Sequence, residues 1–309
     1  MHRFRFAVQL SRAASGHEWR ALARKAEDLG YSTLLMPDHL DEQWSPFVAL
    51  TVAAECTTAL RVGTLVLGND YRHPVLVARE AATLDLLSEG RFELGMGAGW
   101  MTSDYEQAGI VLDDPGMRVE RLAESVVVVK GLLRSGTTSA SGPHYRLAGA
   151  SGYPAPSASH TPPIMIGGGS PRVLALAGRE ADIVGVNPRL TPGVIGPEAI
   201  ASAVPEAYDR RLQWIRQAAG DRMEQIELQC LTFVVRVVPD GQRVIDELAP
   251  MFSMTPAEAA QTPVALVGTV EQIADTLEAR RARWGFSYIV VHEAELDVFA
   301  PVVSRLTGK

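Results

Sequence analysis

Apolar runs alternate with segments of mixed apolar and polar residues along the whole chain. The runs are typical of buried strands, and the mixed segments carry apolar positions at helical spacing. Eight strands are predicted, at residues 4–10, 33–36, 61–67, 91–96, 163–167, 182–187, 227–237 and 287–292. Strands that alternate with helices form parallel βα units, and eight such units predict an α/β fold, a single TIM-type (β/α)8 barrel domain over residues 1–309.

The helices between these strands have recognisable starts, stops and buried faces. Trp19 and Ala26 lie on one apolar stripe of the first helix, and Gly30 is placed to end it. Thr269 and Gln272 have the spacing of a capping box at the start of a later helix. Such stripes are typical of packing against a sheet.

Two stretches interrupt the alternation. Residues 134–162 are rich in Gly, Ser, Ala and Pro and show no clean period, which predicts an insertion between the fourth helix and the fifth strand. Long loops in barrels usually carry function, so this insertion is expected over the active-site face. Residues 251–267 form a second irregular region after the seventh strand.

The charge of the chain narrows the range of partners. Hydrophobic residues make up 47% of the chain and charged residues 21%, close to ordinary globular usage. A net charge of −7 and a pI near 5.6 argue against nucleic acid and anionic membranes as partners, because both require a basic footprint. No segment approaches the ~18 continuous apolar residues of a membrane span, so a cytoplasmic protein acting on a small molecule is expected.

Cysteine and histidine usage gives no sign of a metal site. Cys56 and Cys230 are the two cysteines, they form no CxxC motif, and both are expected to be buried free thiols. His292 and Glu293 lack the second histidine of a helical HExxH motif. No metal is therefore expected.

Functional residues of a TIM-type barrel lie at the carboxyl ends of the strands. The second strand ends in Asp38 and His39, an acid beside an imidazole. Imidazole titrates near neutrality and a neighbouring carboxylate can orient it, so the pair is a candidate for proton transfer. The alternative is a helix-capping aspartate followed by a solvent-exposed histidine.

The fifth strand ends in a glycine-rich turn. Gly167, Gly168 and Gly169 precede Ser170 and Pro171, a good cap and first-turn pair for a helix. Backbone N–H groups in such a turn form a concave donor surface, and the helix dipole favours an anion at the same place. This pattern predicts a phosphate site, although a tight strand-to-helix turn would also explain it.

The fourth strand runs into the sequence RFELGMGAGW at residues 91–100. Gly95, Gly97 and Gly99 share one face of that strand. Glycine weakens a strand interior, so three in alternation indicate that something comes close to the bare backbone. A flat cofactor ring would fit there; alternatively, small residues simply let the barrel close.

Six motifs, taken in order, resemble those of the luciferase-like oxidoreductase superfamily, and more closely its branch that uses the deazaflavin coenzyme F420. They are Asp38-His39, Gly63-Thr64, Arg72-His73-Pro74, Arg91-Phe92 with GMGAGW, IGGGS at 166–170, and Gly268-Thr269. None is specific alone, whereas their order and spacing together are. The resemblance covers nearly the whole chain.

The resemblance implies a cofactor ring across the barrel mouth with its phosphate at the fifth βα turn. It also implies a non-proline cis peptide between Leu65 and Val66, behind the ring. The residues that it implies in cofactor binding are Leu65, Val66, Gly68, Asn69, Gly97, Ala98, Gly99, Trp100, Gly167, Gly168, Gly169 and Ser170.

The resemblance further implies hydride transfer between F420 and an organic substrate. His39 is expected to supply the proton, and Asp38 to orient His39 or to hold the ring. Related sugar-phosphate dehydrogenases carry a glutamate where this chain has Trp100. Trp100 and Tyr105 are expected to line the substrate pocket, and Trp100 suits a fairly apolar substrate. Alternatively, Trp100 points into the core, and Tyr105 or the insertion lines the pocket.

A second hypothesis for the function assumes the same barrel. It is a luciferase-like monooxygenase that takes reduced FMN from a partner reductase, and Arg172 could grip the single phosphate of that flavin. In either case the resemblance implies a homodimer, formed through the helix at residues 74–88.

Overall fold

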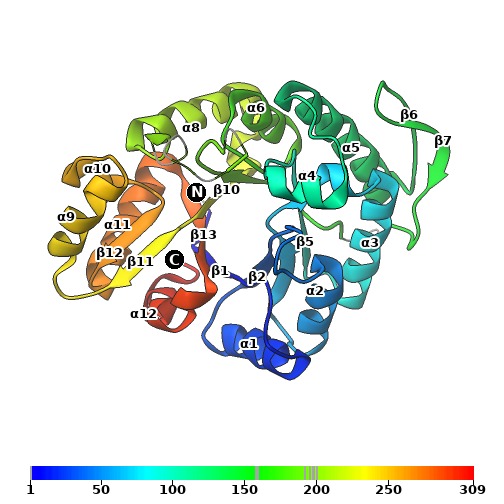
Figure 1. Cartoon of the computed structure of the whole chain (residues 1–309). Coiled ribbons are helices and arrows are strands. Elements are labelled where there is room, and N and C mark those ends of the chain that lie inside the picture. The colour runs from blue at the N-terminus through cyan, green and yellow to red at the C-terminus, as the bar shows by residue number, and fades with distance from the viewer. Residues whose placement is uncertain (1, 157–159, 191–192, 195, 197–198, 200) are drawn as a thin grey trace.

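A computed structural model describes the chain except residues 1, 157–159, 191–192, 195, 197–198 and 200. The chain forms a closed barrel of parallel strands inside a ring of helices (Figure 1). The barrel strands are β1 (Arg5–Gln9), β2 (Thr33–Met36), β3 (Arg61–Thr64) continued by β4 (Leu67–Gly68), β5 (Phe92–Gly97), β8 (Ile164–Gly168), β9 (Ile183–Val186), β10 (Glu227–Leu231) and β13 (Phe286–His292). Each coincides with a predicted strand, so the predicted (β/α)8 fold is confirmed.

The strands follow the order β3-β2-β1-β13-β10-β9-β8-β5, and β5 pairs with both β3 and β4 to close the ring. The first and last strands are neighbours, with Arg5 opposite Tyr288 and Gln9 opposite His292. Because all strands run in the same direction, their carboxyl ends meet at one face of the barrel.

Helices cover the outside of the barrel, as Figure 1 shows. They are α1 (Gly16–Asp28), α2 (Pro46–Glu55), α3 (Pro74–Leu87), α4 (Thr102–Ala108), α5 (Pro115–Ser135), α6 (Pro171–Glu180), α8 (Pro205–Ala219), α9 (Gly241–Met251), α10 (Pro256–Gln261), α11 (Val270–Trp284) and α12 (Leu296–Leu306). Thr269 and Gln272 form the predicted capping box of α11, and Gly30 follows α1 with a φ of 84°. In the described part of the chain, no helix is long and apolar enough to cross a bilayer.

The predicted strand at residues 227–237 is two strands. β10 belongs to the barrel, whereas β11 (Val234–Val237) pairs in parallel with β12 (Ala265–Gly268) outside it. The chain leaves the barrel at Thr232 and Phe233. The N–H of Thr232 donates to the carbonyl of Val290 in β13, whereas that of Phe233 donates to the carbonyl of Val264, just before β12. The region 251–267, predicted to be irregular, contains α10 and most of β12.

The predicted insertion at residues 134–162 contains an antiparallel hairpin, β6 (Thr137–Ser141) and β7 (Arg146–Ser151). Figure 1 draws it at the periphery, beside α3 and α5. Tyr145, between the two strands, is buried and its hydroxyl lies 3.4 Å from the amide nitrogen of Asn69 at the end of β4. Its position over the active-site face stays a prediction.

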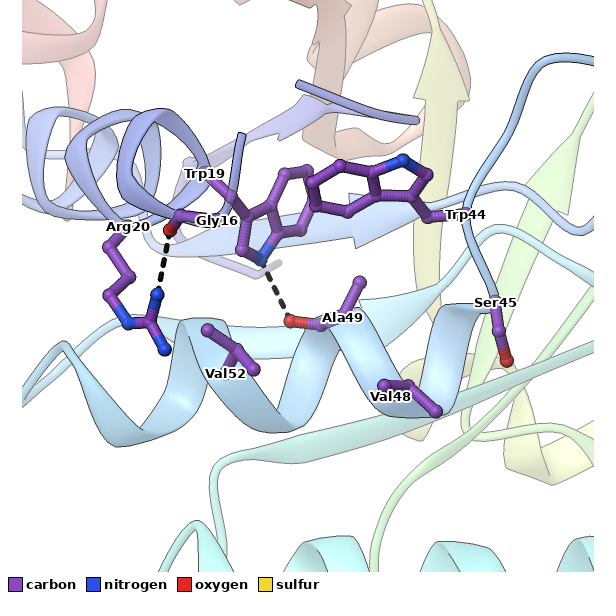
Figure 2. Close-up of a pocket in the computed structure, with 8 residues that line it drawn as sticks. All are labelled: Gly16, Trp19, Arg20, Trp44, Ser45, Val48, Ala49 and Val52. Carbon is purple, nitrogen blue, oxygen red and sulfur yellow. Dashed lines mark hydrogen bonds between the residues drawn. The ribbon is translucent and has the colours of Figure 1, made fainter. Parts of the chain in front are cut away.

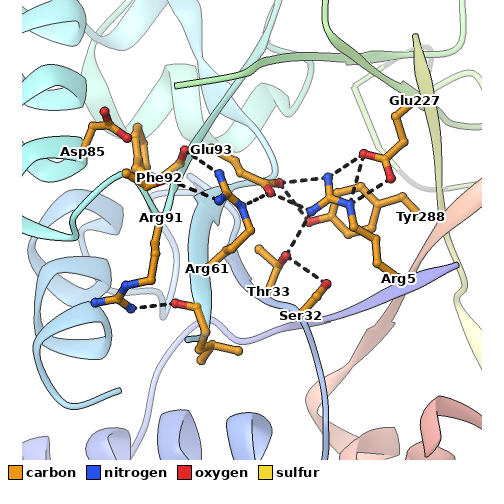
Figure 3. Close-up of polar contacts among 12 residues, drawn as sticks. Arg5, Ser32, Thr33, Arg61, Asp85, Arg91, Phe92, Glu93, Glu227 and Tyr288 are labelled. Carbon is orange, nitrogen blue, oxygen red and sulfur yellow. Dashed lines mark hydrogen bonds and ion pairs between the residues drawn. The ribbon is translucent and has the colours of Figure 1, made fainter. Parts of the chain in front are cut away.

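An ionic network closes the amino-terminal end of the barrel (Figure 3). Glu93 is buried and accepts from Arg5 and Arg61, each at 2.6 Å. Arg5 also pairs with Glu227 at 2.6 Å, and the hydroxyl of Tyr288 donates to Glu93 at 3.1 Å. These five side chains come from five strands and lie at the face of a TIM-type barrel that serves stability rather than catalysis.

Candidate functional site

The carboxyl ends of β2, β4, β5 and β8 bring several predicted site residues together. The N–H of Gly68 donates to the Asp38 carboxylate at 3.0 Å, which joins the ends of β4 and β2. The rings of His39 and Trp100 meet edge to face with centroids 5.5 Å apart, which joins β2 to the segment after β5. Val66 lies against both Gly97 of β5 and Gly167 of β8, so residues from four strand ends form one site at the predicted face of the barrel.

Asp38 is buried, and both oxygens of its carboxylate accept hydrogen bonds. Its carboxylate accepts two bonds from the guanidinium of Arg72, at 2.5 and 3.0 Å, in addition to the one from Gly68. A bidentate pair of this kind fixes geometry strongly. The predicted orientation of His39 by Asp38 is therefore wrong, because the hydrogen bonds of Asp38 go to Arg72 and Gly68; its contact with a ring stays a prediction.

His39 is oriented by a carboxylate that the sequence analysis did not single out. Its Nδ1 lies 2.7 Å from Oδ2 of Asp104, a fully buried residue in the first turn of α4. Asp104 also accepts from the N–H of Leu40 at 3.0 Å and from the hydroxyl of Tyr71 at 3.1 Å. Since an ionised carboxylate only accepts, Nδ1 of His39 carries the proton and Nε2 makes no hydrogen bond within the described residues.

Tyr71 remains a donor in this arrangement. Burial and then the neighbouring carboxylate of Asp104 raise its pKa well above its usual range. The phenol is therefore protonated at neutral pH and holds Asp104 from the side opposite Leu40. The only sequence signal for Asp104 is an acidic residue early in a helix, which usually indicates a favourable interaction with the helix dipole.

Trp100 and Tyr105 have different surroundings. Trp100 is half-buried beside His39, as a pocket wall requires. Tyr105 is 1% exposed, and its hydroxyl donates to Asp70 at 2.9 Å. Burial and then Asp70 raise the pKa of Tyr105 above its usual range, so this hydroxyl stays a donor to Asp70. The structure thus leaves Tyr105 almost no surface with which to line a pocket.

The glycines of β5 admit the neighbouring strand. A Cβ on Gly95 would lie 1.9 Å from the carbonyl oxygen of Thr64, and one on Gly97 would lie 2.6 Å from Cγ2 of Val66. The peptide between Leu65 and Val66 is cis, as predicted. The sequence analysis expected a cofactor ring against these glycines. In the structure the segment between β3 and β4 packs against them instead.

The loop after β5 is held from outside. The carbonyls of Ala98 and Gly99 accept from the guanidinium of Arg118 on α5, a buried residue that sequence reasoning missed. Gly99 has a φ of 73°, and a Cβ there would lie 1.9 Å from the hydroxyl of Tyr105. Only glycine fits this position, which sets the direction in which Trp100 leaves the strand.

The turn after β8 has the features of an anion site. Ser170 caps α6, but its hydroxyl bonds no backbone group of that helix. Within the described part of the chain, the N–H groups of Gly169 and Ser170 donate to no protein atom. Free backbone donors at a helix N-terminus fit a phosphate group. Among the described residues, no group of three His, Cys, Asp or Glu side chains could hold a metal ion.

Two open apolar grooves lie between outer helices. One of about 340 Å³ lies between α1 and α2 and is lined by Trp19, Trp44 and Val48 (Figure 2). The other, of about 400 Å³, lies between α2 and α3. Neither groove is lined by any of the site residues described above.

Comparisons with known proteins show which family the chain resembles. Residues 1–234 match the family described as luciferase-like monooxygenases. A 4-hydroxyprotoasukamycin monooxygenase of Streptomyces nodosus subsp. asukaensis is 40% identical over 121 residues, which cover 37% of this chain and 32% of that protein. The chain thus matches about a third of the length of this relative.

Two further comparisons extend over nearly the whole chain. An F420-dependent glucose-6-phosphate dehydrogenase of Kribbella flavida is 27% identical over 301 residues, 87% of this chain and 86% of that protein. The solved structure of the coenzyme F420-dependent tetrahydromethanopterin reductase of Methanopyrus kandleri superposes with a TM-score of 0.77 at 18% identity, covering 99% of this chain and all of that one. At this identity the second comparison shows the fold alone.

Proposed function

The chain belongs to the luciferase-like monooxygenase family, and on that premise we propose that it transfers a hydride between coenzyme F420 and a fairly apolar organic substrate. The observation that carries the proposal is the His39–Asp104 pair beside Trp100 at the carboxyl ends of the strands. The near full-length similarity to an F420-dependent dehydrogenase supports F420 as the cofactor.

The residues present fit a ring with a phosphate-bearing tail. The free N–H groups of Gly169 and Ser170 would hold the phosphate. Val66, which lies against Gly97 and Gly167, would back the ring. When bound, the deazaflavin supplies the carbon that accepts or donates the hydride.

The protein contributes orientation and proton transfer. Asp104 holds Nδ1 of His39, so that Nε2 is the nitrogen available to give a proton to the substrate or take one from it. Trp100 offers an apolar wall and a single N–H donor, and so favours a substrate with few polar groups. Asp38, tied to Arg72, keeps the ends of β2 and β4 together.

Parallel fluorescence titrations of the purified protein with F420 and FMN test the proposal. We expect F420 to bind at least tenfold more tightly than FMN. Tight binding of FMN with no binding of F420 would instead favour the second candidate, a monooxygenase supplied with reduced FMN by a partner reductase. That candidate is supported by the similarity of one segment to the Streptomyces monooxygenase.

We also propose a homodimer formed through α2 and α3. Leu76 and Leu87 are each 52% exposed beside the groove between these helices, and Val48 is 69% exposed on α2. Apolar patches of this kind on a soluble protein are typical of interfaces. We expect light scattering to give twice the mass of the 33.3 kDa chain, and Leu76→Glu to shift the protein toward a monomer.

Val127→Glu is the matched control for this prediction, because Val127 is similarly exposed but lies on α5. It should leave the dimer intact. A wild-type protein that stays monomeric at micromolar concentration would contradict the proposed interface.

A further inference from the structure

Arg211 is a buried cation that has no carboxylate partner among the described residues. It lies on α8, is 2% exposed, and makes no ion pair with any described residue. Its guanidinium stacks over the ring of Tyr208 at 4.9 Å, and its Nη1 is buried without a hydrogen-bond partner. Burial first, and then nearby cations such as Arg210 and Arg189, lower the pKa of Arg211. A buried positive charge is costly unless an anion compensates it.

Within the described part of the chain, the side chain of Arg211 makes one hydrogen bond, with the turn after β8. Its Nε donates to the carbonyl of Gly169 at 3.3 Å. The preceding carbonyl, that of Gly168, accepts from the N–H of Asn187 at 2.9 Å. Two successive carbonyls of the turn are thus held toward the body of the protein.

This arrangement dictates where the turn's N–H groups point. In a trans peptide the carbonyl and the following N–H point in opposite directions. The N–H groups of Gly169 and Ser170 therefore face away from Asn187 and Arg211, toward the open side of the turn. They are the same two groups that donate to no described protein atom.

We propose that Arg211 is the positioning residue of this anion site. It holds the Gly169 carbonyl inward, so that the N–H groups of Gly169 and Ser170 face the cofactor's phosphate, and it places a positive charge beneath that phosphate. The inference rests on the proposed function, and it names a determinant of cofactor binding outside the glycine motif.

Arg172, the cation nearest to the turn in sequence, is less suited to this role. Its guanidinium pairs with Glu120 at 2.8 Å, and both side chains are about 60% exposed. The backbone of the turn packs closely against the segment after β9, since a Cβ on Gly169 would lie 2.4 Å from the carbonyl oxygen of Asn187. Arg211 is the cation that contacts the turn from within.

The test compares cofactors with and without their phosphate. Dissociation constants of F420 and of its phosphate-free deazaflavin alcohol, and of FMN and riboflavin, are measured by fluorescence on wild type, Arg211→Met and Arg211→Lys. Arg210→Met is the matched control, since Arg210 is exposed on the same helix and carries the same charge. We expect Arg211→Met to raise the dissociation constant of the phosphate-bearing ligand at least tenfold, and that of the phosphate-free ligand less than twofold.

Arg211→Lys keeps the charge and should lose less affinity for the phosphate-bearing ligands than Arg211→Met. Arg210→Met should bind all of these ligands like wild type. Equal weakening of both ligand forms, or no weakening, would overturn the inference. If Arg211→Met fails to fold, the test uses Arg211→Lys instead. The inference then requires that Arg211→Lys lose affinity for the phosphate-bearing ligand and keep it for the phosphate-free one.

Inorganic phosphate separates this inference from the proposed function. A wild-type protein that binds none of the four ligands overturns the proposed function. In that case a rise in melting temperature with phosphate that Arg211→Lys diminishes still supports the role of Arg211, and a rise of equal size in both proteins overturns it.

Discussion

Replacing His39 with alanine is expected to lower kcat with F420 by about 10²–10⁴-fold, the usual contribution of a positioned general acid or base. The dissociation constant of F420 should change little, because the proposed contacts to its phosphate lie on a different strand. The measurement follows deazaflavin absorbance with a substrate found by screening apolar alcohols, ketones and enones. Turnover by His39→Ala equal to that of wild type would contradict the assigned role.

Asp104→Asn distinguishes orientation from mere presence of the imidazole. An amide can donate to Nδ1, which would favour the tautomer that carries its proton on Nε2. Loss of the partner that orients a functional histidine typically costs at least 10–100-fold, and the pH dependence of kcat should change as well. His17→Ala, at an exposed position on α1, is the control and should leave turnover unaltered.

Replacing Glu93 with glutamine is expected to lower the free energy of unfolding by roughly 3–5 kcal/mol, because Arg5 and Arg61 would lose the buried carboxylate that they share. At roughly 2 °C per kcal/mol for a chain of this size, the melting temperature should fall by about 6–10 °C. Urea unfolding and thermal melts followed by circular dichroism measure both quantities. Glu278→Gln, at an exposed position on α11, should cost less than about 0.5 kcal/mol.

The same variant carries a pH signature. Burial raises the pKa of Glu93, but Arg5 and Arg61 lower it by more, so the folded-state pKa lies below the unfolded one. Its contribution to stability is therefore complete above the unfolded value of about 4.3 and is lost as the pH falls through the folded-state pKa. Wild type should lose stability below about pH 4.3 more steeply than Glu93→Gln. Equal acid sensitivity of the two proteins would contradict this.

The sequence predicted the barrel because strand and helix periodicities reflect which faces are buried. It did not predict where the seventh strand leaves the barrel, because the residues on both sides of Thr232 are similarly apolar although they belong to different sheets. The β6–β7 hairpin escaped prediction for a different reason. Its small, mostly exposed residues produce no alternation of apolar and polar positions.

The contacts within the candidate site were harder to predict from the sequence than the fold. Asp38 and His39 are adjacent in the sequence, but successive residues of an extended chain point to opposite sides, so their side chains have different partners. The partner of His39 is 65 residues away, and Arg211 lies 42 residues from the carbonyl that it holds. Such pairs depend on how strand ends and helices meet in space, which no local pattern encodes.

The residues of the ionic network at the amino-terminal end of the barrel are synthesised at different times, because they lie far apart in the sequence. Arg5 is the first of these residues to be made, Glu227 follows 222 residues later, and Tyr288 is the last. Until then Glu93 has only Arg5 and Arg61 as partners within this network, and β1 has no strand on one side. Closure therefore waits for the last strand, and a nascent chain that stops before β13 retains exposed strand edges, the state in which aggregation and chaperone binding are most expected.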